Sequence, residues 1–292
     1  MISHAQQPVR MLLACLAIAC AFAATAASAA DLEELREAGT IRVAIADEKP
    51  YGYIDDDGNA RGPGPDVARH VLGEIGIDDI EWVVTGFGDL IPGLQDGRFD
   101  MAAAEMAILP ERCQKVIYSE PNTTYGEGLL VKAGNPHGLR FYSDFSTTAG
   151  NDDLRVAVLE GANQLGYLHK LGVPDDRIVT IESNEDAIEA ITSGRANAYA
   201  ATSLTVAGLA EQSNAVEPSL NFVDPVIDGK EVRGWGAFAF NKSSTDLRDA
   251  VNEVLVPYKY TDEWESTLRR YGFSKLDVLN SFKYDTEQLC NP

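Results

Sequence analysis

The sequence predicts an α/β protein made of two hinge-linked lobes with a cleft between them. Apolar strand-like runs alternate with helical segments along most of its 292 residues, as in parallel sheets whose faces are covered by helices. The alternation restarts near residue 140. The stretches 90–106 and 187–204 also match, because each holds an apolar helix, a Gly-Arg pair and a strand of small residues. These observations favour two similar lobes over one continuous sheet.

The first lobe is predicted to comprise residues 31–132 and 236–292. One short helix ends at Gly39, and a second begins in a Gly-Pro turn and ends at Gly76. Apolar runs bounded by turn residues predict the strands. In chain order, helices are expected at 31–39, 62–76 and 88–97, and strands at 40–47, 80–85, 99–106 and 127–134.

The second lobe is predicted over 138–230, and the chain then returns to the first. Its expected strands are 154–161, 176–183 and 196–201, with helices at 162–172 and 184–194. A strand at 235–242 and two helices around Pro257 would lead back onto the first lobe. The predicted hinge is therefore 133–137 and 231–235, and the expected ligand site is the cleft, at the carboxyl ends of the strands.

Residues 1–30 have the pattern of a cleaved secretory signal. Arg10 precedes an apolar run that closes in small residues with an Ala-x-Ala site, and cleavage is expected after Ala29 or Ala30. A periplasmic location is therefore expected. A membrane anchor is the alternative, because the run approaches the ~20 residues that span a bilayer. A lipoprotein is a weaker one, because neither cysteine in the run follows a clean lipobox.

The remaining chain is strongly acidic. Removing the signal takes away one arginine and no acidic residue, so the formal net charge changes from −21 to about −22. This charge disfavours nucleic acid and anionic lipid as partners. A monomer that works in an aqueous compartment is expected, with the acidic residues on a solvated surface.

Two cysteines, Cys113 and Cys290, remain after the signal is removed. In an oxidising compartment they are expected to form one disulfide, and two buried free thiols are the alternative. No CxxC or Cys/His cluster indicates a metal. We interpret His70, His137 and His169 as surface or turn residues, and expect no cofactor.

Signatures of catalysis are missing from the sequence, but a recognition pattern is present. There is no GxSxG, HExxH, Walker A or GxGxxG after a strand. Polar or aromatic residues instead follow the buried strands, at 46–53, 85–90, 104–113, 159–164 and 199–204. Among them Arg112, in a Pro-Glu-Arg turn, could clamp a carboxylate with two parallel hydrogen bonds. A structural salt bridge to Glu111 or Glu105 is the alternative for this arginine.

Several motifs resemble the extracytoplasmic solute-binding proteins that supply polar amino acids to ABC importers. They are the opening GTIRVA, GPDVA, DLIPGLQDGRFD, PER and the closing YGFS, spread over residues 38–289. The resemblance implies the two-lobed type II periplasmic-binding-protein fold, which closes on its ligand by hinge bending. It also implies that Arg112 binds the α-carboxylate of the ligand and that an ABC permease at the membrane is a partner.

The sequence departs from ordinary amino-acid binders at two positions. Those proteins usually carry an aspartate near Thr202 to hold the α-ammonium, and Thr or Ser where Ala107 stands, whereas this strand reads NAYAATSLTV. An unpaired buried ammonium would cost several kcal/mol. We therefore expect the cation of the ligand to be held differently or to be absent.

A more specific resemblance is to the subfamily that binds ectoine and hydroxyectoine. It rests on Glu48, Pro50 and Tyr51, on Phe87 before GxxIPGLQ, and on PERC, GNPxGL, GVPxDR and the C-terminal LC. It implies a small zwitterionic ligand with a delocalised cation on aromatic faces. That subfamily has a third aromatic at the position of Ala107, for which Trp235 or Tyr53 could compensate. The expected ligand-binding residues are Glu48, Tyr51, Phe87, Met106, Ala107, Arg112, Asn163, Thr202 and Trp235.

Two other functions remain open on sequence grounds. The same fold serves periplasmic cyclohexadienyl dehydratases, and Glu48 or Glu105 could be a general acid, although no second titrating group is evident. A sensor module acting through a partner is the other. We favour a transport-binding protein over both, with a polar amino acid as the alternative ligand.

Overall fold

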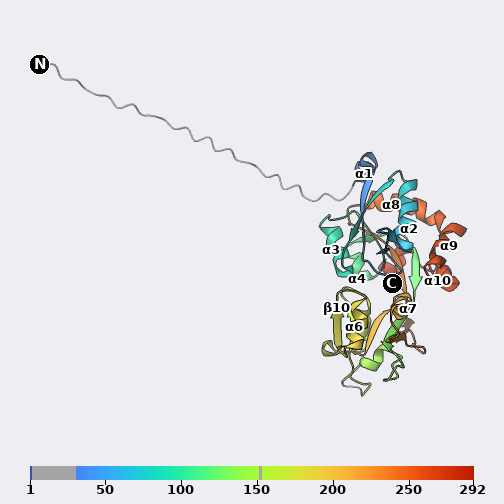
Figure 1. The fold of residues 1–292 in the computed structure, drawn as a ribbon. Helices are drawn as coiled ribbons and strands as arrows, with labels where there is room; N and C mark the ends of the chain where they lie inside the picture. Colours follow the sequence, from blue (N-terminus) through green and yellow to red (C-terminus); the bar gives the residue numbers. More distant parts are fainter. Residues whose placement is uncertain (2–30, 151–152) are drawn as a thin grey trace.

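The computed structural model describes Met1, residues 31–150 and residues 153–292. The predicted signal segment, apart from Met1, lies outside the described residues. The described chain forms two α/β lobes placed end to end (Figure 1). None of the helices in its described part combines the length and apolarity that crossing a bilayer requires.

The first lobe is built on a mixed sheet with the strand order β4-β1-β5-β15-β6, and β7 also pairs with β15. β1 is parallel to β4 and β5, whereas β15, which returns from the second lobe, is antiparallel to β5. The strands are β1 (Thr40–Ile45), β4 (Asp79–Val84), β5 (Met101–Ala107), β6 (Ile117–Tyr118), β7 (Thr123–Tyr125) and β15 (Gly234–Phe240).

Helices cover both faces of this sheet. Side chains along each strand point alternately to the two faces, where they join two separate hydrophobic cores. Val43 of β1 packs with α2, α8 and α9, around the fully buried Trp264, whereas its neighbour Ala44 packs with α3. The helices are α1 (Leu32–Ala38), α2 (Pro63–Glu74), η1 (Phe87–Asp89), α3 (Leu90–Gln95), α4 (Pro110–Cys113), α8 (Thr245–Tyr258), α9 (Asp262–Arg270), α10 (Lys275–Asn280) and α11 (Thr286–Cys290). A small hairpin of β2 (Tyr53–Ile54) and β3 (Ala60–Arg61) precedes α2.

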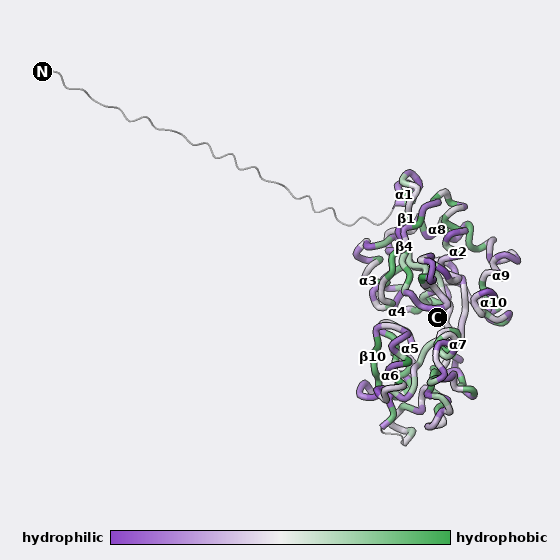
Figure 2. Tube along the Cα trace, viewed as in Figure 1, coloured by the Kyte–Doolittle hydropathy of each residue, from purple (hydrophilic) through white to green (hydrophobic). Residues whose placement is uncertain are grey.

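The second lobe has a sheet with the order β10-β9-β11-β8-β12 and two cores of its own. Its strands are β8 (Glu127–Lys132), β9 (Val156–Leu159), β10 (Ile178–Ile181), β11 (Ala198–Thr202) and β12 (Val216–Pro218). Its helices are η2 (Tyr142–Phe145), α5 (Gln164–Lys170), η3 (Asp175–Arg177), α6 (Asp186–Thr192) and α7 (Ser203–Gln212). Figure 2 shows hydrophobic residues along the strands of both lobes and hydrophilic residues on the outer loops and turns.

The chain passes between the lobes earlier than the sequence predicted. β8 was assigned to the first lobe, but it pairs with β11 and β12 of the second sheet. The crossing therefore lies at Gly126, between β7 and β8, and not within 133–137, which form a turn inside the second lobe. An apolar strand is compatible with either sheet, so its sequence does not reveal its partner.

The return crossing runs from Pro218 to Gly234 and carries the hairpin of β13 (Val226–Ile227) and β14 (Lys230–Glu231). The two crossings are tied together by the backbone N–H of Glu127, which donates to Asp224 Oδ1 at 2.9 Å. The predicted hinge at 231–235 overlaps the end of this segment, but β15 already belongs to the first sheet from Gly234 onward.

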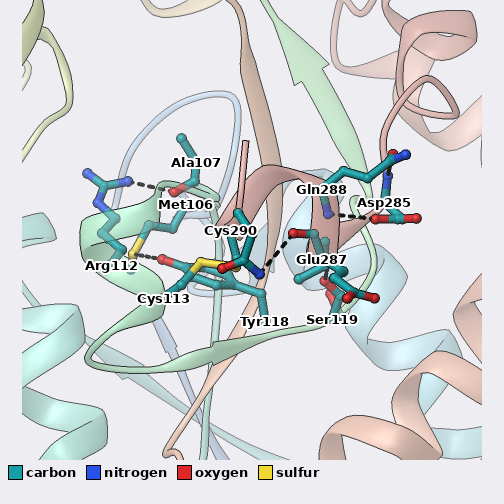
Figure 3. Close-up of a disulfide and its surroundings, with 12 residues drawn as sticks. Met106, Ala107, Arg112, Cys113, Tyr118, Ser119, Asp285, Glu287, Gln288 and Cys290 are labelled. Carbon is teal, nitrogen blue, oxygen red and sulfur yellow. Dashed lines mark hydrogen bonds between the residues drawn. A yellow bond between two sulfur atoms is a disulfide. The ribbon is translucent and has the colours of Figure 1, made fainter.

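The predicted disulfide between Cys113 and Cys290 is present and spans 177 residues of sequence. It joins α4 to the C-terminal helix α11 (Figure 3). The first residue of α11, Thr286, donates to Ser119 O at 2.6 Å. Leu289 and Cys290 pack against the α3-side core of the first lobe. The C-terminus is thereby attached to the short helix that carries Arg112.

We expect removal of this disulfide to lower the free energy of unfolding. By the chain-entropy model, a closed loop of this length contributes at most about 5 kcal/mol. The double variant Cys113→Ser/Cys290→Ser should therefore show a lower urea midpoint than the oxidised wild type, and the reduced wild type should match the variant. Equal midpoints for the variant and the oxidised protein would contradict a stabilising bond.

Candidate ligand-binding site

A small cavity lies between the lobes at the carboxyl ends of their central strands. Its volume is about 20 Å³, which is room for roughly one water molecule. The residues that line it are Glu48, Tyr51, Phe87, Ala104, Glu105, Tyr125, Leu159, Ala162, Asn163, Gln164, Tyr199, Ala201 and Thr202. Five of the nine predicted ligand residues are in this set: Glu48, Tyr51, Phe87, Asn163 and Thr202.

The loop after β1 brings Glu48 and Tyr51 into the cleft. It is closed by paired backbone hydrogen bonds between Glu48 and Gly52, at 2.9 and 3.0 Å. The start of α2 then rests directly on β5, because a Cβ atom at Gly64 would lie 2.2 Å from Ala103 O. This close packing fixes the loop relative to the strand that forms the floor of the site.

Four aromatic rings surround the cavity. Tyr51 meets Tyr125 edge to face, with ring centroids 5.1 Å apart. Phe87 enters from η1 of the first lobe and Tyr199 from β11 of the second. Tyr125 and Tyr199 are not among the nine predicted ligand residues, although Tyr199 begins the predicted recognition stretch 199–204. The signal for Tyr199 was its alternation with Ala201 along one strand, which puts both side chains on the same face.

Arg112 lies at the edge of the cavity and spans the cleft. It is 7% exposed, and its guanidinium donates to Ala107 O at 3.0 Å and to Gly161 O of the second lobe at 2.9 Å. The same group lies 5.5 Å from the centroid of the Phe87 ring. Figure 3 shows its side chain extending away from the disulfide. The alternative of a salt bridge to Glu111 or Glu105 is not what the structure shows.

The rims of the two lobes touch at glycines beside this arginine. A Cβ atom on Gly161 would lie 2.7 Å from Gly88 Cα, and the backbone φ of Gly161 is +75°. A side chain at Gly161 would therefore hold the two rims apart. Glycine at this position lets the carbonyl of Gly161 reach the guanidinium of Arg112.

Glu48 is a first-lobe carboxylate surrounded by second-lobe donors. Thr205 Oγ1 donates to Glu48 Oε1 at 3.1 Å, and the Asn184 side chain also hydrogen-bonds this carboxylate. Burial raises the pKa of Glu48 from 4.5 to about 7, while the hydrogen bonds from Thr205 and Asn184 lower it. Arg112 also lowers this pKa, which places the cation within electrostatic reach of the carboxylate.

A second buried carboxylate, Glu105, lines the cavity from β5. Both its oxygens accept hydrogen bonds of 2.6 Å within the first lobe, from Asn122 Nδ2 and Thr123 Oγ1. Burial raises the pKa of Glu105 to about 7. Its backbone has φ +48°, which is unusual for a residue other than glycine and interrupts the alternation of side chains along β5. Its side chain is therefore held by the lobe.

Four predicted residues are not part of the cavity lining: Arg112, which lies at its edge, and Met106, Ala107 and Trp235. Met106 is buried in the first-lobe core, where its sulfur accepts from Tyr118 OH at 3.2 Å, and Ala107 presents its carbonyl to Arg112. Trp235 packs edge to face on Tyr284 and donates from Nε1 to Asn280 O at 3.1 Å. Trp235 therefore does not supply the wall expected to replace an aromatic at Ala107.

Asn163 and Gln164, at the start of α5, contribute the amide groups of the site. Asn163 Nδ2 donates to Tyr167 OH at 3.0 Å, and Gln164 Nε2 donates to Glu127 Oε2 at 2.7 Å. Glu127 is 3% exposed and its Oε1 has no hydrogen-bond partner. Glu127, the first residue of β8, is therefore linked to α5 by the hydrogen bond from Gln164.

Burial favours the neutral form of Glu127, whereas the hydrogen bonds from Gln164 and Tyr142 lower its pKa. The hydroxyl of Tyr142 has one proton but three oxygen neighbours, Glu127 Oε2 at 3.0 Å, Gly128 O at 3.0 Å and Ala201 O at 3.2 Å. The hydroxyl proton of Tyr142 is therefore shared between Glu127 Oε2 and two backbone carbonyls. Burial, the largest cause, raises the pKa of Glu127 from 4.5 to about 7.

The described residues contain no group of three or more His, Cys, Asp or Glu side chains arranged to hold a metal ion. The chemistry available at the cavity is therefore that of two carboxylates, one guanidinium, amides, hydroxyls and aromatic faces. This set can bind a small molecule that carries a cation and a carboxylate.

Comparisons with known proteins agree with this geometry. Two α/β lobes that enclose a ligand cavity form the type II periplasmic-binding-protein fold, so the molecule is a solute-binding protein. The family model for bacterial extracellular solute-binding proteins, family 3, matches residues 41–275, and the chain belongs to this family.

Three relatives are informative. The probable amino-acid ABC transporter periplasmic-binding protein y4tE of Sinorhizobium fredii (strain NBRC 101917 / NGR234) is 50% identical over 267 residues, which cover 91% of this chain and 87% of the relative. The crystal structure of EhuB in complex with hydroxyectoine has a TM-score of 0.80 and 32% identity, covering 89% of this chain and 97% of EhuB. AncCDT-1, an ancestral amino-acid-binding protein and precursor of cyclohexadienyl dehydratase, has a TM-score of 0.70 and 29% identity, covering 82% and 98%.

We expect Glu127→Gln to change how stability depends on pH. The pKa of Glu127 is about 7 in the folded protein, above its ordinary value of 4.5. Glu127 therefore contributes to the free energy of unfolding fully below pH 4.5, and this contribution is lost as the pH rises through 7. Between pH 4.5 and 8, the unfolding free energy of the variant should rise relative to wild type by up to about 3 kcal/mol. Urea unfolding across this range measures it.

Glu265→Gln is the matched control, because Glu265 lies on the surface of α9 and pairs with Arg269 at 3.6 Å. Its curve should run parallel to that of wild type. A Glu127→Gln curve that also runs parallel would contradict a neutral, buried Glu127.

Proposed function

We propose that this protein is the extracytoplasmic substrate-binding component of an ABC importer and that it carries a small zwitterion of the ectoine or hydroxyectoine type. A cleaved signal segment would export it to the periplasm, where a permease would receive the loaded form. The observation that carries the proposal is the placement of Glu48 and Arg112 around one tight cavity with aromatic walls.

The cavity suits a delocalised cation better than a plain ammonium. Thr202, where amino-acid binders usually carry an aspartate, is the N-cap of α7 and its hydroxyl accepts from Thr205 N at 3.2 Å. The acidic group beside it is Glu48, which comes from the opposite lobe. A flat amidinium could donate to Glu48 and lie against the rings of Tyr51 and Phe87.

The carboxylate of the ligand would bind at Arg112. Two of the guanidinium N–H groups donate to the carbonyls of Ala107 and Gly161, and the group is oriented by these bonds and by the Phe87 ring. A guanidinium has five N–H donors, so others remain for a carboxylate. Gln164 and the backbone at the start of α5 would supply further donors.

One finding supports this ligand class over an extended amino acid. EhuB, whose structure was solved with hydroxyectoine, matches 89% of this chain. The 50% identical relative is named for amino-acid transport, so a polar amino acid is the alternative ligand.

Ligand-induced stabilisation tests the proposal. Ectoine and hydroxyectoine should raise the melting temperature with concentration, whereas glutamine, glutamate, histidine and arginine should not. Glu48→Gln should weaken ectoine binding by about 10- to 100-fold in calorimetry, because a hydrogen bond to a charged group is lost. Glu265→Gln, far from the cavity on α9, should bind as wild type does.

Stabilisation by amino acids alone would reject the ectoine assignment and keep the transport role. Turnover of prephenate or arogenate would instead indicate an enzyme, as the similarity to a dehydratase precursor allows. In that case Glu48→Gln should abolish turnover, and ligand binding without turnover excludes this alternative.

A further inference from the structure

Three hydroxyl groups form a chain that ends on Glu48. Tyr51 OH donates to Thr202 Oγ1 at 2.7 Å, Thr202 Oγ1 lies 2.9 Å from Thr205 Oγ1, and Thr205 Oγ1 donates to Glu48 Oε1 at 3.1 Å. Tyr51 and Glu48 belong to one loop of the first lobe, whereas both threonines lie at the start of α7 in the second. The chain therefore leaves the first lobe and returns to it.

Proton counting gives every bond in this chain a direction. Thr205 has one hydroxyl proton, which goes to Glu48, so Thr202 must donate in the contact between the threonines. Thr202 Oγ1 in turn accepts from Tyr51 OH and from Thr205 N, at 2.7 and 3.2 Å. All hydroxyls then point towards Glu48, and hydrogen bonds aligned in this way polarise one another.

We propose that this relay orients Glu48 and keeps it ready to accept the cationic N–H groups of a ligand, which makes Thr205 a positioning residue of the binding site. The inference rests on the proposed function, because it concerns the carboxylate assigned to the ligand cation. Thr205 is 1% exposed and does not line the cavity, so it acts through Glu48.

A second support for Glu48 comes from α6 and β11. The oxygen of the Asn184 amide accepts from Tyr199 OH, which leaves its nitrogen to donate to Glu48. Tyr199 is also a wall of the cavity. Glu48 thus has two second-lobe donors, and its remaining lone pairs are available to a ligand.

The charged groups that face Glu48 do not replace the relay. Glu185, at the start of α6, raises the pKa of Glu48, and Arg112 lowers it by less than the hydrogen bonds do. The phenols of Tyr51, Tyr125 and Tyr199 lie near this carboxylate, and a second carboxylate, Glu105, lines the same cavity. Loss of the Thr205 donor should therefore raise the pKa of Glu48 further, and leave less of the carboxylate form near neutral pH.

Thr205→Val tests the proposal, because valine keeps the shape of threonine and removes only the hydroxyl. The Thr202 cap on Thr205 N does not need that hydroxyl. Ectoine affinity should be measured by calorimetry from pH 5.5 to 8.5. Wild type should bind best above pH 7 and lose affinity below it. The variant should bind about tenfold more weakly at pH 7, with its midpoint at higher pH.

Two further variants separate positioning from general packing. Thr205→Ser restores the hydroxyl and should restore both affinity and midpoint. Thr124→Val is the matched control, because Thr124 is buried in β7 and its hydroxyl donates to Asp277 O at 3.1 Å, on a different network. The proposal is overturned by a wild-type pH profile for Thr205→Val, or by a serine variant that behaves as the valine variant does.

A direct titration distinguishes failure of the relay from failure of the ligand assignment. ¹³C-carboxyl NMR of Glu48, assigned with Glu48→Gln, needs no ligand and should show a higher midpoint in Thr205→Val than in wild type. Equal midpoints overturn the relay even if ectoine binds. A wild type that does not bind ectoine rejects the proposed ligand, whatever the titration shows.

Discussion

The structure of the site depends on one buried carboxylate that both lobes hold. Glu48 belongs to the first lobe, yet Thr205 and Asn184, its hydrogen-bond donors, belong to the second. A buried carboxylate without donors would be strongly unfavourable. The contact between the lobes therefore supplies the groups that make Glu48 tolerable in its ionised form. Under the proposed function, the same contact forms the site for the ligand cation.

Arg112 is anchored at the edge of the cavity by a different kind of constraint. Its helix has four residues and begins at Pro110, which is too short to be rigid on its own. The Cys113–Cys290 disulfide joins the residue after Arg112 to α11, and α11 is bonded to Ser119. The guanidinium then meets Gly161, where two glycines allow the rims to touch. The disulfide thus holds in place the short helix from which Arg112 reaches Gly161 of the second lobe.

The sequence could predict the features that local chemistry determines. Helix caps, strand ends and the pairing of two remaining cysteines follow from residue type and compartment, and the loop with Glu48 and Tyr51 follows a strand directly. The lobe of β8 could not be predicted, because buried apolar strands are alike whichever sheet they join. Tyr125 and Tyr199 were missed for a related reason, since an aromatic within a strand usually belongs to a core. Met106 and Ala107 were misplaced because the unusual backbone at Glu105 changes which side chains of β5 face the cleft.

The positions of Tyr125 and Tyr199 explain how the cavity is walled without an aromatic residue at Ala107. Ala107 does not line the cavity, so an additional ring was not needed at that position. Its carbonyl instead holds Arg112, while Tyr125 and Tyr199 close the space from β7 and β11. Both tyrosines are also bonded into the polar network, Tyr125 to Glu105 O at 2.9 Å and Tyr199 to Asn184. The walls of this cavity are therefore fixed by hydrogen bonds as well as by packing.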